Sequence, residues 1–143
     1  MSDGGPWFRL LDHTGDMAIL VRAPDLEGLY DGLTRALFEV MMDTRTIDAS
    51  KTVAVGVEDA VDAEDLVVRY LSELLFLHDA RDWVFRGAKV RRVTDTAIQA
   101  DALGEPFDPV RHAIDRQIKA VTHHHLLLSR DRDGWTARCV LDL

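Results

Sequence analysis

The sequence predicts an α+β fold, with two helices packed on a mostly antiparallel sheet. The spacing of apolar residues changes several times along the chain between two, the period of a strand, and 3.6, the period of a helix. Several neighbouring strands are separated only by short turns, which favours antiparallel pairing. The chain has 143 residues, with no internal repeat and no long linker, so we expect residues 1–143 to form a single domain.

Two helices are predicted from apolar stripes that follow capping residues. Asp25 is suited to cap a helix over residues 26–42, and Asp62 is suited to cap a second helix that ends near Asp79. Both segments repeat their apolar residues at intervals of three and four residues, so each helix has one apolar face. Each of these faces requires a sheet or another helix to cover it.

Alternating apolar and polar side chains predict strands in the rest of the chain. The segments are residues 7–12, 17–22, 51–58, 83–93, 96–103, 114–129 and 135–143. The first two are close enough to form a hairpin, and Thr94-Asp95 and Asp133-Gly134 are turn signals for two more. Residues 114–129 are interpreted as one long bent strand or as two consecutive strands. Pro106 and Pro109 interrupt the pattern, so the segment that contains them is expected to be a loop or one short turn.

Composition restricts the location and the partners of the protein. The formal net charge of −8 is repelled by phosphate at long range, so strong direct binding of nucleic acid is not expected. The basic residues Arg86, Lys89, Arg91 and Arg92 are interpreted as the solvated face of a strand. The start of the chain lacks the pattern of a signal peptide, and no stretch reaches the roughly 20 apolar residues that span a membrane. We therefore expect a cytoplasmic protein that does not bind membranes.

The segment Asp12-His13-Thr14-Gly15-Asp16 brings two carboxylates and an imidazole into one turn. Calcium and magnesium prefer several oxygen ligands, and such a turn can direct two carboxylates toward one ion. Asp, Thr and Gly are also ordinary turn-forming residues whose side chains bond to the local backbone. The turn alone therefore leaves a cation site and a purely structural turn open.

Two further candidates lie near the end of the sequence. Asp142 and the α-carboxylate of Leu143 place two anionic groups side by side, and a cation or a lysine would relieve their repulsion. A solvated acidic end is the other interpretation.

Lys119 lies within the apolar segment 118–122, so its ammonium group needs a partner if its neighbours are buried. The alternative is a strand lysine that points to solvent.

The run His123-His124-His125 is the last candidate. The first and third histidines share one face of a strand, as a zinc or manganese pair would require, but a third ligand is not evident. A structural or solvent-exposed role is therefore preferred.

Cys139 lies on the apolar face of the last predicted strand and is interpreted as an inert core thiol. Neither a glycine-rich phosphate loop nor a nucleophile elbow is present in the sequence.

Several short motifs follow one another in a definite order. After the Asp-His-Thr-small-Asp turn come Ala36-Leu37-Phe38-Glu39-Val40-Met41, Leu71-Ser72-Glu73-Leu74-Leu75-Phe76-Leu77, Gly104-Glu105, Ile118-Lys119-Ala120-Val121-Thr122 and Leu141-Asp142-Leu143. In this order, and over residues 8–143, the sequence resembles the archease family. The resemblance implies a strand–helix–strand–strand module that carries an inserted β-rich module.

The resemblance also implies a function. Archeases assist RNA ligases of the RtcB type in tRNA splicing and other RNA repair. Such a ligase is first guanylylated by GTP with the help of metal ions, and the archease promotes this step and allows multiple turnover. The protein is therefore expected to activate a ligase and not to be a catalyst by itself. GTP would reach it only through the ligase.

The family's metal site corresponds to Asp16, Asp142 and the terminal carboxylate of Leu143, and its functional lysine corresponds to Lys119. Asp12 and His13 belong to the same motif, as residues for local hydrogen bonding and for contact with nucleotide or ligase. The resemblance implies a divalent cation: calcium in crystals, with magnesium or manganese as the alternatives in function.

The sequence departs from the family's pattern in the surroundings of this site. The small residue of the turn is Gly15 instead of Ala, and Leu143 replaces Ile. Gln117 replaces an acidic residue, and His123-His124 replaces Tyr-His, which leaves the polar surroundings of the lysine open.

Two other functions remain open on the sequence. The same carboxylates would suit a stand-alone metal-dependent hydrolase of a small phosphorylated substrate, although no nucleophile or general base is evident beyond the histidines. A simple metal-binding or interaction module would bind a cation without any effect on ligation.

Overall fold

The structure is a computed structural model that describes residues 6–13 and 15–143, without the side chain of His13. Thr14 of the predicted turn, and residues 1–5 of the predicted N-terminal segment, lie outside the described residues. No helix in the described part of the chain is both long enough and apolar enough to cross a membrane.

The first unit of the fold is a four-stranded antiparallel sheet in the order β1-β2-β7-β6. Its strands are β1 (Trp7–His13), β2 (Asp16–Ala23), β6 (Ala120–Asp131) and β7 (Gly134–Asp142). Helix α1 (Leu26–Met41) follows β2 and contacts β1, β2 and β7. Val21 packs so closely on this helix that a side chain at Gly32 would collide with it. Odd-numbered residues of β2 therefore face α1, and even-numbered residues face away from it.

The second unit is inserted between α1 and β6. It begins with the short 3₁₀ helix η1 (Thr44–Thr46) and contains β3 (Lys51–Val57), α2 (Ala63–Arg81), β4 (Trp83–Val93) and β5 (Ile98–Pro106). The strands form a three-stranded antiparallel sheet in the order β3-β5-β4. Gly104 in β5 is required by this pairing, because a Cβ there would lie 1.9 Å from the carbonyl oxygen of Val84.

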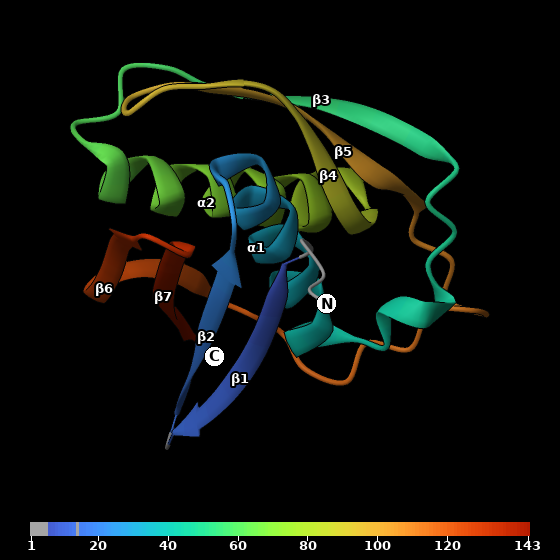
Figure 1. Cartoon of the computed structure of the whole chain (residues 1–143). Helices are drawn as coiled ribbons and strands as arrows, with labels where there is room; N and C mark the ends of the chain where they lie inside the picture. Colours follow the sequence, from blue (N-terminus) through green and yellow to red (C-terminus); the bar gives the residue numbers. More distant parts are fainter. Residues whose placement is uncertain (1–5, 14) are drawn as a thin grey trace.

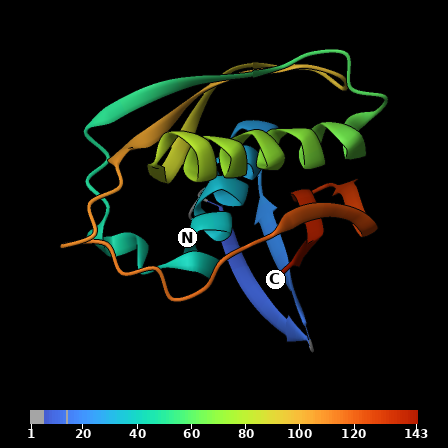
Figure 2. The ribbon, with the colours of Figure 1, turned by 180° about the vertical axis from the view of Figure 1, so that it is seen from behind.

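The two units share one topology. In each, a strand is followed by a helix and two further strands. The third of these strands lies between the other two in the sheet, in the order β2-β7-β6 in one unit and β3-β5-β4 in the other. Figures 1 and 2 show the helices lying between the two sheets. No sequence repeat marks this relation, because only the order of the elements and their apolar faces are shared.

One continuous cluster of buried side chains joins both units. Helix α1 touches α2 and β4 of the inserted unit as well as its own sheet. In the contact between the helices, the Thr34 hydroxyl donates to the carbonyl oxygen of Tyr30 at 2.8 Å and accepts from the hydroxyl of Tyr70 at 2.7 Å. This core is the kind that one domain would have, and the assignment of residues 1–143 to a single domain stays a prediction.

The α+β class and both helices are confirmed. Asp25 and Asp62 cap the helices through side-chain bonds to Gly28 N and Asp65 N, and the second helix continues to Arg81. The strands divide into two sheets instead of one, and the inserted unit contains a helix besides its strands. Strands can be predicted from local alternation, but their partners cannot, because pairing joins distant segments.

Residues 114–119 differ from the prediction. The strand predicted from residue 114 begins only at Ala120, and before it the chain makes a single bridge, Ile114 with Met42. The amides of Asp115 and Arg116 donate to the carbonyl oxygen of Met41, so the end of α1 takes the hydrogen bonds that a strand neighbour would take. Ile118 is buried without belonging to a strand. Its apolar side chain produced the apparent alternation.

Candidate metal site

The candidate site lies where β2 begins and β7 ends. Asp16 is the cross-strand partner of Asp142 in the β2–β7 pairing. Side chains of directly opposite residues share a face of the sheet, with Cβ atoms about 4.5–5.5 Å apart. The two carboxylates predicted from opposite ends of the sequence are thus brought together, on the face turned away from α1.

Lys119 and Leu143 are tied to the same place through their backbones. The amide of Lys119 donates to the carbonyl oxygen of Asp142 at 2.7 Å, immediately before β6 begins. The amide of Leu143 donates to the carbonyl oxygen of Gly15 at 3.4 Å. Lys119 is exposed, and its backbone lies beside that of Asp142. The structure therefore places four of the residues singled out in the sequence around one strand end.

The hairpin turn between β1 and β2 positions Asp16. Gly15 adopts a φ of 78°, in the left-handed region that glycine enters without strain. His13 pairs with Asp16 through the backbone. Asp12 pairs with Met17, and strand alternation puts both on the opposite face of the sheet from Asp16. The structure thus separates Asp12 from the two paired carboxylates.

The donor set at this strand end suits a hard cation. Two aspartate side chains and a terminal carboxylate would supply oxygen ligands only, which calcium, magnesium and manganese prefer. Among the described residues, no group of three or more His, Cys, Asp or Glu residues is placed to hold a metal ion. Asp16 and Asp142 supply two carboxylates at this strand end, and so few protein ligands would suit an ion that keeps several water ligands.

The histidine run does not gather around one point. The His123 ring lies 2.8 Å from a carboxylate oxygen of Asp65 on α2. The pKa of Asp65 is lowered, chiefly by the hydrogen bond from the amide of Val61 and next by the bond with His123. His124 and His125 lie with their ring centroids 3.9 Å apart. His125 has a φ of 55°, where the pairing of β6 with β7 is irregular between Thr122 and Leu127. The structure gives His123 a contact between the two units.

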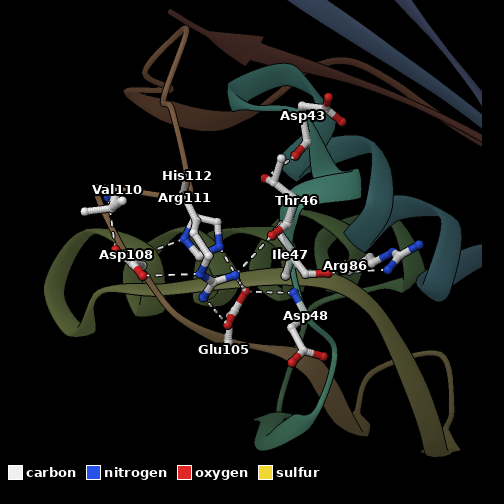
Figure 3. Close-up of polar contacts among 10 residues, drawn as sticks. All are labelled: Asp43, Thr46, Ile47, Asp48, Arg86, Glu105, Asp108, Val110, Arg111 and His112. Carbon is white, nitrogen blue, oxygen red and sulfur yellow. Dashed lines mark hydrogen bonds and ion pairs between the residues drawn. The ribbon is translucent and has the colours of Figure 1, made fainter.

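Sequence reasoning missed a second polar centre, built around Glu105 at the end of β5 (Figure 3). The carboxylate accepts two bonds from Arg111, at 2.6 and 3.1 Å, and one from the amide of Asp48 at 2.7 Å. His112 is buried, and its Nε2 atom lies 2.9 Å from the Oε2 atom of Glu105. The amide of Asp108 donates to Nδ1 of His112, so Nε2 of the imidazole carries the proton and donates to Glu105.

The Arg111 guanidinium, followed by the amide of Asp48 and the ring of His112, holds the pKa of Glu105 at about 2. The glutamate therefore stays ionised, with all its bonds made inside the protein. The cluster fastens the irregular segment 107–119 at one end, and the hydrogen bond from Lys119 to Asp142 fastens it at the other. A sequence signal existed only in the pair Gly104-Glu105, because a glutamate close to prolines otherwise resembles a solvated loop residue.

Comparison with known proteins assigns the chain to a family. A model of the archease protein family (MTH1598/TM1083) matches residues 8–143. The chain is 33% identical over 147 residues to the protein archease of Methanosarcina barkeri, with 100% of each chain covered. It is 34% identical over 136 residues to the protein archease of Pyrococcus furiosus, covering 92% of this chain and 95% of that one.

A solved structure agrees with these relatives. The solution structure of Methanobacterium thermoautotrophicum protein 1598 is similar to this chain with a TM-score of 0.69 and 32% sequence identity. The similarity covers 95% of this chain and 98% of that protein. On the match of the family model and on these full-length relatives, the chain belongs to the archease family.

Proposed function

We propose that this protein activates an RNA ligase of the RtcB type, by promoting guanylylation of the ligase and its multiple turnover in tRNA splicing and RNA repair. It acts as a protein cofactor and is not a catalyst by itself. Membership of the archease family supports this function. The observation that carries it is the direct pairing of Asp16 with Asp142, with Lys119 and Leu143 bonded beside them.

Asp16, Asp142 and the carboxylate of Leu143 are the residues that hold a divalent cation in this proposal. Two carboxylates directly opposite each other on adjacent strands repel, and a bound cation removes that penalty. When bound, the cation supplies positive charge for phosphate oxygens. Calcium, magnesium and manganese all match the oxygen donors.

Lys119 supplies a second positive charge from the protein itself. Its backbone is fixed by the bond to Asp142, while its exposed ammonium group can reach outward. A lysine binds phosphate oxygens as a compact charge, so it can orient the phosphates of GTP in the ligase's nucleotide pocket. His13 lies at the same turn and would meet the nucleotide or the ligase from the neighbouring strand.

The proposal requires the strand end to dock at the ligase's nucleotide pocket. The net charge of −8 favours approach to a ligase whose RNA channel is basic, and disfavours competition for the RNA itself. The GTP would then be bound by the ligase, with this protein contributing only the edge formed by its carboxylates and Lys119.

The experiment is a multiple-turnover ligation of an RNA ending in a 2′,3′-cyclic phosphate to a 5′-hydroxyl RNA. The cognate RtcB-type ligase and GTP are used with and without substoichiometric amounts of this protein. Faster formation of the guanylylated ligase and repeated turnover are expected. An active ligase that gains nothing from the protein would contradict the proposal. Metal-dependent release of phosphate from small phosphate esters, without any ligase, would instead support the stand-alone hydrolase.

A further inference from the structure

A groove runs along the outer side of α2, between the edge strands of the two sheets. β3 forms the edge of one sheet and β6 the edge of the other, and α2 contacts both strands. Figure 2 shows the helix with β3 above it and β6 below it. The groove has a volume of about 700 Å³, and none of the residues of the candidate metal site lines it.

The floor of the groove is largely apolar. Val68, Ser72 and Phe76 follow one another at intervals of four residues, so they lie on one side of α2. Phe76 is 47% exposed, and Val57 and Val121 at the two walls are only half-buried. A ligand with aliphatic side chains would remove this surface from water, which favours binding.

Asp65 on the floor is already satisfied inside the protein. Its carboxylate accepts from the amide of Val61 and from the guanidinium of Arg69, each at 2.9 Å, and it lies 2.8 Å from the ring of His123. Because Arg69 is engaged with Asp65, the charges of these two residues offset each other.

The charge that remains in the groove is negative. Glu58 and Glu73 also line it, and neither forms an ion pair with any residue that the structure describes. Two arginines lie at its rim: Arg81 is placed over the ring of Phe76 at 5.9 Å, and Arg92 lines a smaller hollow beside Glu58. Neither arginine is bonded to the two glutamates, which are therefore complementary to a lysine or arginine of a ligand.

The walls of the groove favour an extended polypeptide as that ligand. β3 and β6 each pair with a strand on one side only, so among the described residues their other edges present N–H and C=O groups without a strand partner. An extended segment pairs with such an edge through its backbone and directs alternate side chains to the floor. A small organic cation would meet the glutamates but leave the strand edge unpaired.

We propose that this groove binds an extended basic segment of a partner polypeptide, which adds as a strand to the edge of β3. β3 is the better of the two edges, because it pairs with β5 without interruption, whereas the pairing of β6 is irregular between Thr122 and Leu127. Aliphatic side chains of the segment contact Phe76 and its neighbours, and a lysine or arginine binds Glu58 or Glu73. The groove is separate from the metal site, so this binding does not depend on the proposed function.

The probe is a blocked peptide of alternating lysine and valine, as long as β3, titrated into the isotope-labelled full chain and followed by NMR. The amide signals of Gly56, Ser72 and Val121 should shift, while a peptide of alternating glutamate and valine should leave them unchanged. Two further peptides carry N-methyl groups on the valines or on the lysines. Because an added strand bonds through one edge, one of these should bind about ten-fold more weakly and the other like the parent.

A matched pair of double variants tests the charges. Glu58→Gln combined with Glu73→Gln should raise the Kd of the lysine peptide about five-fold. Glu27→Gln combined with Asp133→Asn removes the same charge from exposed positions outside the groove and should stay within about two-fold of the wild type. Thermal unfolding of each double variant should match the wild type, so that a weaker Kd reports the groove and not the fold.

Several results would overturn the inference. The lysine peptide could leave the groove signals unshifted, or bind the Glu58 and Glu73 double variant as tightly as the wild type. If both N-methylated peptides bind like the parent and spermine shifts the same signals, the groove holds an organic cation and not a strand. Ligase activation is measured without these peptides, so failure here leaves the proposed function standing, and failure there leaves the groove.

Discussion

Asp16 and Asp142 lie directly opposite each other on neighbouring antiparallel strands, although they come from opposite ends of the sequence. Each is positioned by regular sheet pairing and not by a loop, so the fold sets the separation of the two backbone positions. Like charges at such a position destabilise a sheet unless a cation or a partner molecule separates them. In the proposed function, a bound cation relieves this repulsion.

Asp142→Asn should stabilise the metal-free protein and abolish its response to cations. Removing one of two opposed charges is expected to raise the free energy of unfolding by roughly 0.2–1 kcal/mol. Calcium should raise the Tm of the wild type and leave that of the variant unchanged. Asp95→Asn is the control, because Asp95 is exposed in the turn between β4 and β5 and should keep the wild-type response. An equal calcium shift in Asp142→Asn and wild type would count against the site.

Lys119→Met should separate cation binding from activation. The ammonium group is lost but the carboxylates remain, so the calcium-induced rise in Tm is expected to persist. Stimulation of the ligase should fall by roughly ten-fold to a hundred-fold, as for the loss of one charged group that contacts a reacting phosphate. Lys89→Met is the matched control, because Lys89 is an exposed residue of β4. Unchanged stimulation by Lys119→Met would mean that this lysine is a solvent-exposed residue without a role in activation.

Glu105→Gln should destabilise the protein, because the charge that receives Arg111, His112 and the amide of Asp48 is lost. Hydrogen bonds to a charged group contribute roughly 1.5–3 kcal/mol each, so a loss of that order is expected at pH 7. Urea unfolding followed by circular dichroism measures it. Gln99→Glu, an exposed exchange in the same strand, controls for the chemical change and should be close to neutral.

The stabilisation that Glu105 provides, measured against Glu105→Gln, should decrease at low pH. The pKa of Glu105 is lowered to about 2 from its ordinary value of 4.5, so the ionised group stabilises the fold fully above pH 4.5. That contribution is lost as the pH falls from 4.5 toward 2. The difference in unfolding free energy between wild type and Glu105→Gln should therefore be constant at neutral pH and shrink below pH 4.5. A difference that is equal at pH 7 and pH 3 would contradict the ion pair.

Cys139 should be unreactive in the folded protein. It is fully buried in β7, and burial raises the pKa of its thiol to about 12, so almost no thiolate exists at pH 8. Ellman's reagent should modify the protein only after denaturation, when one thiol per chain reacts. Rapid modification of the native protein would show that β7 opens at its buried face.

Much of the fold could be predicted from the sequence because its signals are local. The caps Asp25 and Asp62 and the leucine stripes of both helices required only neighbouring residues, and the helices begin where those residues predict. The pairing of Asp16 with Asp142 could not be obtained in that way, since strand partners are chosen by burial across the whole chain. That these residues belong to one site was predicted from the family resemblance and not from the periodicity.

Residues 114–119 and Glu105 show why the rest was missed. An apolar residue such as Ile118 is buried whether or not its backbone has a strand neighbour, so alternation alone cannot separate a strand from a packed irregular segment. Glu105 is buried, and Arg111 and His112 reach its carboxylate from the following loop. Nothing in the spacing of those residues distinguishes this arrangement from a solvated acidic loop.

The central claim is that the carboxylate pair at the end of β2 and β7 carries the activation. The most direct measurement is the initial rate of ligase guanylylation by GTP in the presence of wild type, Asp16→Asn or the control Asp95→Asn, at one fixed metal concentration. The account predicts that the wild type and the control accelerate guanylylation equally and that Asp16→Asn, although folded, leaves the rate at that of the ligase alone. Full acceleration by folded Asp16→Asn would contradict it.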